Sequence, residues 1–402
     1  MDWMIGINMN RRKFIIKGLL AFSAFFFRKL WFKGGAAEAA VVKGLSESNP
    51  SKGEKMVEPG SRVISVRSEG VTGWDYRSYP YADSVNERLV VKMLNESVKG
   101  LTSESDEGDA WRRIFISYKK GDIIAIKPNF NDLYNGFKGF VASPAVLNAI
   151  IEGLVSFVRV PAGDIIIYDC TRIIPDEFRD RIRYQVRYVE PFGSSFLRKV
   201  RYKTLGNDLV KADLNYEIKM SAEVKDKKGV SVKCYLPKVI TGAAHIINVP
   251  ILKSHQYVSN SGALKNHYGT VRFSDGHTGP EYLHPPILDE SIVDINSHPE
   301  IRTKTRLIVM DGLFGRLAKK GGLPERWKSF EDKSPDSLLV SADPVALDTV
   351  ALHLLSQEAK ARGEALLPHE YLHIANDKGL GVHEDPSPDG EFKRIDLRRI
   401  EI

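Results

Sequence analysis

The densest group of chemically active side chains lies in residues 248–269. Two lysines, two histidines and an asparagine follow an apolar run there: Lys253, His255, Lys265, Asn266 and His267. Lysine and imidazole groups around a glycine-containing loop can hold an anion, share a metal ion or position a proton acceptor. Because the residue types alone do not choose among these chemistries, the elements that position them must be identified next.

Short apolar runs alternate along the chain with segments of helical periodicity. The runs are typical of buried strands and cover 63–66, 123–126, 165–168, 244–249, 307–310 and 338–340. Apolar residues spaced near i, i+3, i+4 predict helices over 85–98, 144–158, 344–355 and 369–376. Two of these helices begin with a polar N-cap before proline, at Ser143 and Asp343. The alternation predicts an α/β fold with a mainly parallel central sheet flanked by helices.

Composition divides the chain into three parts. Residues 41–60 are rich in Ser, Gly, Lys and Glu, which is typical of a solvated linker, and a single α/β domain is predicted over 61–402. The stretch at about 179–235 interrupts the strand–helix rhythm and contains a hairpin-type turn at 226–229. We therefore expect an inserted β-rich lobe there.

The first 40 residues resemble a twin-arginine signal peptide. Arg11 and Arg12 precede the apolar run 19–27, which is followed by Arg28, Lys29 and a small-residue stretch. The run is shorter than the roughly 20 apolar residues needed to span a bilayer of about 30 Å. The pattern predicts export by the twin-arginine machinery to the periplasm or another extracytoplasmic location. An uncleaved leader would anchor the protein to the membrane, and a chance basic start is the alternative.

Charge and cysteine content exclude several classes of protein. Residues 1–40 hold seven Lys/Arg and two Asp/Glu, so they carry +5 of the formal +7 and leave about +2 on the remainder. Without a dense basic stripe, nucleic acid is not an expected partner. Cys170 and Cys234 are the two cysteines and form no C-x-x-C, so no iron–sulfur cluster is expected. They could form one disulfide or remain as two buried thiols.

Polar residues terminate several predicted strands. In parallel α/β sheets, ligands bind beyond the carboxyl ends of the strands. The residues at these ends are Lys127 with Asn129, Asp169 with Thr171 and Arg172, Asn248, and Asp311. Such groups are costly to desolvate unless they are paired, which favours a shared ligand or ion. The alternative is a buried structural ion pair between Lys127 and Asp169 or Asp311.

Histidines favour a divalent transition metal as one candidate cofactor. Six of the ten lie between His245 and His298, and none of these six belongs to an H-E-x-x-H pair. We expect His255 to act with a carboxylate from Asp169 or Asp311. A Gly- and Pro-rich stretch containing His277 and His284 is typical of a lid. The spacings of a nucleotide P-loop, a nicotinamide-binding turn and a G-x-S-x-G serine hydrolase are absent.

An ordered set of motifs, taken together, resembles the family catalogued as domain of unknown function 362. The motifs are I-K-P-N at 126–129, S-P-A-V at 143–146, Y-D-C at 168–170, N-V-P-I-L-K-S-H at 248–255, G-A-L-K-N-H-Y-G at 262–269, V-M-D-G at 309–312, A-D-P-V-A-L-D at 342–348 and K-G-L-G at 378–381. The resemblance covers roughly 120–385. It implies that Lys253, His255, Lys265 and Asn266 belong to the site. Some members carry a ferredoxin-like module, a pattern from which this two-cysteine chain departs.

Two functions are compatible with these patterns. The first is an exported enzyme that binds a metal ion or a small anionic cofactor or substrate at the strand ends. In it, His255 is ligand or base, Asp169 and Asp311 are ligands or acid–base groups, and the anion is held by Lys127, Asn129, Lys253, Lys265 and Asn266. The second is a non-catalytic exported small-ligand-binding or cofactor-maturation protein. A protein partner would then dock on the arginines Arg181, Arg183, Arg187 and Arg198.

Overall fold

The structure is a computed structural model that describes residues 61–132, 139–191, 204–205, 208–317, 322–386 and 390–402. The predicted leader and linker lie outside the described residues, as does Arg198. No helix in these ranges combines the length and the apolar character needed to cross a membrane.

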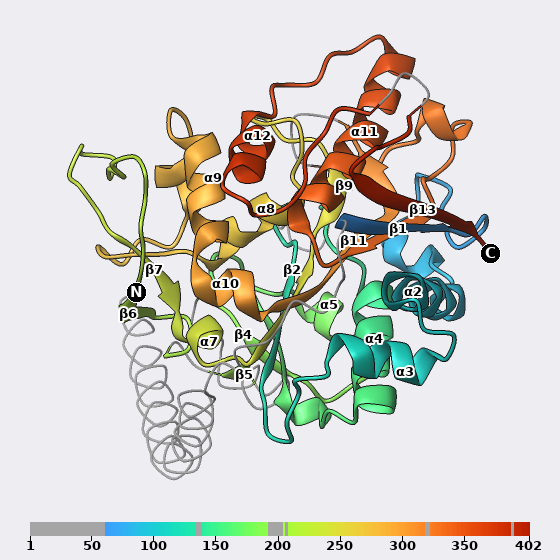
Figure 1. The fold of residues 1–402 in the computed structure, drawn as a ribbon, viewed down its shortest axis with the longest axis horizontal. Coiled ribbons are helices and arrows are strands. Elements are labelled where there is room, and N and C mark those ends of the chain that lie inside the picture. Colours follow the sequence, from blue (N-terminus) through green and yellow to red (C-terminus); the bar gives the residue numbers. More distant parts are fainter. Residues whose placement is uncertain (1–60, 133–138, 192–203, 206–207, 318–321, 387–389) are drawn as a thin grey trace, which may run out of the picture. The chain divides into compact units, whose positions relative to one another are not determined.

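A ten-stranded sheet forms the centre of the described fold (Figure 1). Its order is β13-β1-β12-β11-β8-β2-β3-β4-β5, and β9 pairs with β11. The bounds are β1 Ser61–Arg67, β2 Ile124–Pro128, β3 Ile165–Tyr168, β4 Arg187–Val189, β5 Thr204–Leu205, β8 His245–Val249, β9 Ile251–Lys253, β11 Thr305–Arg316, β12 Ser337–Ser341 and β13 Ile395–Glu401. Strand β12 is antiparallel to β1 and β11, and the other pairs are parallel. The predicted α/β fold is confirmed.

Helices cover both faces of this sheet because its strands are apolar on both sides. In β11, Leu307 and Val309 pack into the cluster that includes α2, α3 and α4, whereas Ile308 and Met310 pack against α11. The helices are α2 Glu87–Thr102, α3 Glu107–Ile114, α4 Pro144–Gly153, α5 Asp176–Arg179, α7 Lys238–Thr241, α8 Ala263–Asn266, α9 Leu288–Ser297, α10 Pro299–Lys304, α11 Pro344–Arg362 and α12 Glu370–Asp377. Successive side chains of β11 therefore point to opposite faces of the sheet, and each face packs against its own layer of helices.

The segment expected to form a β-rich lobe is divided between two sheets. Strands β4 and β5 extend the parallel sheet from β3. Strands β6 (Ala212–Ile218) and β7 (Cys234–Pro237) form a separate antiparallel sheet with β10 (Arg272–Phe273). The predicted turn between β6 and β7 is confirmed, with Gly229 at φ 84° and Asp226 N–H donating to Val230 O at 2.8 Å. Because β10 directly follows residues 262–269, this small sheet holds one end of the candidate site loop.

The two N-caps predicted from sequence are confirmed. Ser143 Oγ accepts from Ala145 N–H at 3.2 Å and caps α4. Asp343 Oδ1 accepts from Val345 N–H at 2.8 Å and Ala346 N–H at 2.9 Å, and caps α11. Each helix has proline in its first turn, where no N–H is required. The two cysteines are both free and buried, which decides between the alternatives left open by the sequence.

Candidate functional site

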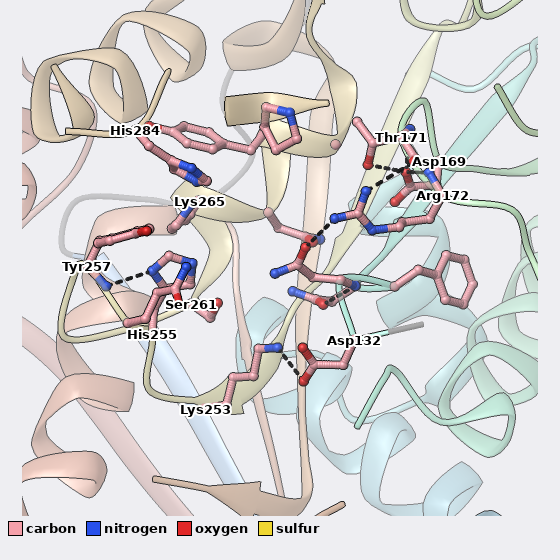
Figure 2. Close-up of a pocket in the computed structure, with 18 of the residues that line it drawn as sticks. Asp132, Asp169, Thr171, Arg172, Lys253, His255, Tyr257, Ser261, Lys265 and His284 are labelled. Carbon is pink, nitrogen blue, oxygen red and sulfur yellow. Dashed lines mark hydrogen bonds and ion pairs between the residues drawn. The ribbon is translucent and has the colours of Figure 1, made fainter. Parts of the chain in front are cut away.

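A polar cavity of about 320 Å³ lies at the carboxyl ends of β2, β3 and β9 (Figure 2). Figure 2 shows Lys253, His255 and Lys265 on one side, with Asp169 and Arg172 on the other. Of the residues predicted to bind a ligand or to act in catalysis, all except Asp311 line it: Lys127, Asn129, Asp169, Lys253, His255, Lys265 and Asn266. The volume falls at the small end of the range of about 300–1,000 Å³ that is typical of small-molecule sites.

Lys127 and Asp169 form a buried ion pair in the cavity wall. Lys127 Nζ lies 2.9 Å from Asp169 Oδ2 and donates to Pro128 O at 2.8 Å. Asp169 Oδ1 accepts from Thr171 N–H, Thr171 Oγ1 and Arg172 N–H at 2.7–2.9 Å. Gly269 packs against this pair, since a Cβ there would approach Lys127 Nζ to 2.8 Å. Both oxygens of Asp169 are therefore already engaged, as expected for the structural alternative.

Lys253 is also neutralised by a carboxylate. Its Nζ lies 2.8 Å from Asp132 Oδ2, and both side chains are less than a tenth exposed. Burial lowers the pKa of Lys253, while Asp132 acts in the opposite direction. The sequence analysis did not single out Asp132, because this carboxylate follows β2 by several residues and lies outside the strand-end pattern.

Lys265 differs from the other two lysines because no acidic side chain among the described residues neutralises it. It is 7% exposed, and within the described part of the chain its Nζ makes no ion pair or hydrogen bond. The ammonium group lies 3.8 Å from the ring centroid of Tyr268, a cation–π contact. Burial, assisted by repulsion from Lys253, lowers the pKa of Lys265 to about 7. Near neutral pH, this lysine can therefore hold or release a proton.

Two neutral histidines lie beside Lys265. His255 Nδ1 accepts from Tyr257 N–H at 3.2 Å, so the proton of its neutral ring resides on Nε2. Burial and the nearby lysines lower the pKa of His255 far below its ordinary value. Burial and Lys265 lower the pKa of His284 to about 4. The rings of His255 and His284 have centroids 6.2 Å apart. The expected lid segment thus contributes His284 to the cavity wall.

The short helix α8 positions Lys265 and Asn266. Asp348, on α11, accepts from Ala263 N–H at 2.5 Å and Leu264 N–H at 3.0 Å, which satisfies the start of α8. At the other end, Asn266 Nδ2 donates to Lys127 O at 3.0 Å and Asn248 Oδ1 at 2.7 Å. Helix α8 is therefore fixed between α11 and the ends of β2 and β8. Asn266 lines the cavity, whereas Asn248 lies outside the lining and connects α8 to β8.

The structure does not bring together the metal-binding set expected from His255, Asp169 and Asp311. Asp311 lies outside the cavity lining, where its carboxylate accepts from Ser143 N–H at 2.6 Å and Leu313 N–H at 3.1 Å. Burial raises the pKa of Asp311 to about 6. In the described ranges, these three residues do not form a group with donor atoms within 4.8 Å of one another. Asp311 instead connects β11 to the start of α4.

Several residues of the site were not singled out from sequence. Arg316 lines the cavity, and Asp348 holds α8 from a helix that is distant in sequence. Asp348 ends the A-D-P-V-A-L-D motif, which is the one sequence signal that marked it. In contrast, His267 is buried outside the cavity lining, with Nδ1 3.3 Å from Thr270 Oγ1. His267 is therefore part of the core beneath the loop.

Comparison with known families identifies the chain at the level of its family. The family model described as a domain of unknown function (DUF362) matches residues 124–353, which is more than half of the chain. The chain therefore belongs to this family, and the match includes the lysine, histidine and asparagine residues that line the cavity. No curated protein matches the sequence.

Proposed function

We propose that this protein of the DUF362 family is an enzyme that binds a small anionic substrate in the cavity, with Lys265 as the principal contact. The observation that carries the proposal is the buried ammonium group of Lys265 at the cavity wall, which no carboxylate in the described part of the chain neutralises. A buried charge without a partner is costly, and an anionic ligand would supply the missing counter-charge.

The charge balance of the cavity supports an anion. Its described lining contains more cationic than acidic side chains: Lys127, Arg172, Lys253, Lys265 and Arg316 against Asp132, Asp169 and Glu281. Two of the lysines are already paired with Asp169 and Asp132, and Arg316 lies 3.4 Å from Glu325, so Lys265 carries most of the excess. A carboxylate, sulfate or phosphate group is the chemistry that complements the remaining charge.

The same residues support proton transfer. A general acid or base works best when its pKa lies near the operating pH, and the pKa of Lys265 is about 7. His255 has a pKa too low for an efficient base, but its Nε2–H can donate to a substrate oxygen. We therefore assign proton transfer to Lys265 and orientation to His255.

The alternative of a protein-docking face has less support. Arg181 lies 2.9 Å from Asp83, Arg183 lies 3.1 Å from Glu152, and Arg187 lies 3.9 Å from Asp164. These neighbouring carboxylates offset the charge that an acidic partner would need. The small-molecule cavity is therefore the better-supported site, and a non-catalytic binding protein would share it.

Anion affinity should depend on the proton of Lys265. We expect sulfate or a short dicarboxylate, which do not titrate between pH 6.5 and 9, to bind about tenfold more weakly for each pH unit above about 7. The loss should level off at the higher pKa that Lys265 acquires in the complex. Isothermal titration calorimetry across this range measures the effect. Equal affinity at pH 7 and pH 9, or no anion binding at all, would contradict the proposal.

We also propose that the protein is exported by the twin-arginine route, on the basis of residues 1–40. Replacing both Arg11 and Arg12 by lysine should keep the charge but leave most of the protein in the cytoplasm. Fractionation of expressing cells, with detection of the full chain, measures the distribution. Equal amounts of wild-type and variant protein outside the cytoplasmic membrane would exclude this route.

A further inference from the structure

A second cluster of potential ligands lies away from the cavity lining, around helix α12. His369, His373 and His383 each offer an imidazole nitrogen, and these nitrogens all lie within 4.8 Å of one another. The ring centroids of His373 and His383 are 4.6 Å apart, and both lie within 5.6 Å of that of His369. None of the three rings lines the cavity described above.

Two of these histidines have the spacing of a helix-borne metal pair. His369 precedes the first residue of α12 and His373 follows one turn later, in the sequence H-E-Y-L-H. Residues four apart in a helix lie on the same face, which brings both rings to one ion. The metal site predicted from sequence was confined to the histidines at 245–298, and this H-E-x-x-H pair at 369–373 was overlooked.

The tautomer of His383 is fixed in the form that suits a metal ion. Thr349 Oγ1 donates its proton to Val345 O at 2.8 Å, so it accepts from His383 Nδ1–H at 2.9 Å. The lone pair of the neutral ring is then on Nε2. His383 is 5% exposed, and its Nε2 is buried without a hydrogen-bond partner. Among the described residues this acceptor is unsatisfied, and a cation shared with the two further imidazoles would explain it.

The backbone around His383 is also held in place. Its N–H donates to Asn376 Oδ1 at 3.1 Å, at the end of α12, and its carbonyl accepts from Arg394 at 3.1 Å. Val382 N–H donates to Asp343 Oδ2 at 3.0 Å. The third nitrogen is thus fixed, while His369 and His373 are more exposed and their side chains can rotate toward an ion.

We propose that His369, His373 and His383 bind a divalent transition metal ion of the Zn²⁺ class. Three imidazoles suit Zn²⁺ and its neighbours in the first transition series, and they leave a fourth position for water. Zn–N bonds of about 2.0–2.1 Å place tetrahedral nitrogens about 3.4 Å apart, so donor atoms within 4.8 Å need only small side-chain rotations to converge. Asp385 is close enough to influence His369 and His383 electrostatically and adds negative charge beside the ion.

The test uses the untagged full chain, stripped of metal with a chelator and then titrated with Zn²⁺ against a chromophoric competitor. We expect one equivalent to bind and to raise Tm. His373→Ala removes an exposed ring, so the fold should survive while Zn²⁺ affinity falls more than about 100-fold, since loss of an outer-shell partner alone costs about 10–100-fold. His353→Ala, a histidine of α11 outside the cluster, is the matched control and should bind as the wild type does.

A variant of Thr349, which orients the ring of His383, separates metal binding from a general structural role of the cluster. Thr349→Val keeps the shape of the side chain but removes the acceptor for His383 Nδ1–H, so Zn²⁺ affinity should fall by about 10–100-fold. With Co²⁺ as the probe, the wild type should show the visible absorption of a tetrahedral nitrogen site, and His373→Ala should not. The proposal fails if the wild type binds no stoichiometric Zn²⁺, or if His373→Ala and His353→Ala bind equally well.

Discussion

Replacing Lys265 by methionine is expected to weaken anion binding by about 100-fold and to make the ligand-free protein more stable. Removing one member of a buried charged contact usually costs 2–5 kcal/mol of binding free energy, roughly 30-fold or more. In the free protein, the same change removes a buried ammonium group that no carboxylate of the described ranges neutralises. We therefore expect the free energy of unfolding to increase by about 1–3 kcal/mol.

The pH dependence of the unfolding free energy is a second, independent test of the lowered pKa of Lys265. The pKa of Lys265 falls from 10.5 to about 7 on folding, so between these values the unfolded chain binds more protons than the folded protein. The free energy of unfolding of the wild type should therefore gain a rising contribution from about pH 7 to 10.5, and Lys265→Met should lose that contribution. Urea unfolding at several pH values measures it, together with calorimetric anion affinity.

The matched control for this variant is Lys360→Met, which removes an exposed lysine of α11. It should change neither anion affinity nor the pH profile. A Lys265→Met protein that binds anions as tightly as the wild type would remove Lys265 from the proposed site. A variant that is less stable than the wild type would show that the ammonium group has a partner in solution that stabilises the fold.

The second large effect is expected for Gly262→Ala, which should lower the free energy of unfolding by about 3 kcal/mol. A methyl group on Gly262 would overlap Asp348 Oδ1, approach Asp348 Cγ to 2.5 Å and approach Asn260 Nδ2 to 2.7 Å. Overpacking of this kind costs about 1–3 kcal/mol, and displacement of Asp348 would also weaken its charge-assisted hydrogen bonds to the start of α8. Because α8 carries Lys265, anion affinity should fall as well.

Gly163→Ala is the control for this substitution. No heavy atom lies within 4 Å of a Cβ at Gly163, and its backbone does not adopt the left-handed conformation that favours glycine. Its unfolding free energy and anion affinity should match those of the wild type. Denaturant unfolding measured by circular dichroism compares both variants directly. Equal stability of the two would mean that Asp348 can move without loss, so that it does not fix α8.

Much of the scaffold could be predicted from local sequence. The apolar runs predicted the strands β2, β3, β8, β11 and β12, because a strand covered by helices on both faces must be apolar on both sides. Ser143 and Asp343 marked helix starts, since a capping oxygen acts on N–H groups only two or three residues away. These features depend on residues that are close in sequence, so periodicity and composition are enough to predict them.

The pairing of strands in the sheets could not be predicted from local sequence. The segment 179–235 has the alternating pattern of a lobe, yet β4 and β5 join the central sheet and β6 and β7 pair with the distant β10. Strand propensity specifies extended backbone without specifying its neighbour. Which edge a strand joins is decided by the hydrogen-bond partners available when the whole sheet assembles.

The sequence by itself determined which chemical groups meet at the strand ends, because Lys127, Asp169 and Lys253 follow apolar strands whose carboxyl ends share one edge. Only the tertiary structure decided how their charges are paired. Asp169 and Asp132 neutralise two lysines, whereas Asp311 turns to the start of α4 and Lys265 has no carboxylate partner among the residues that the structure describes. The energy of a buried charge depends on partners within a few ångströms, which are contributed by segments distant along the chain.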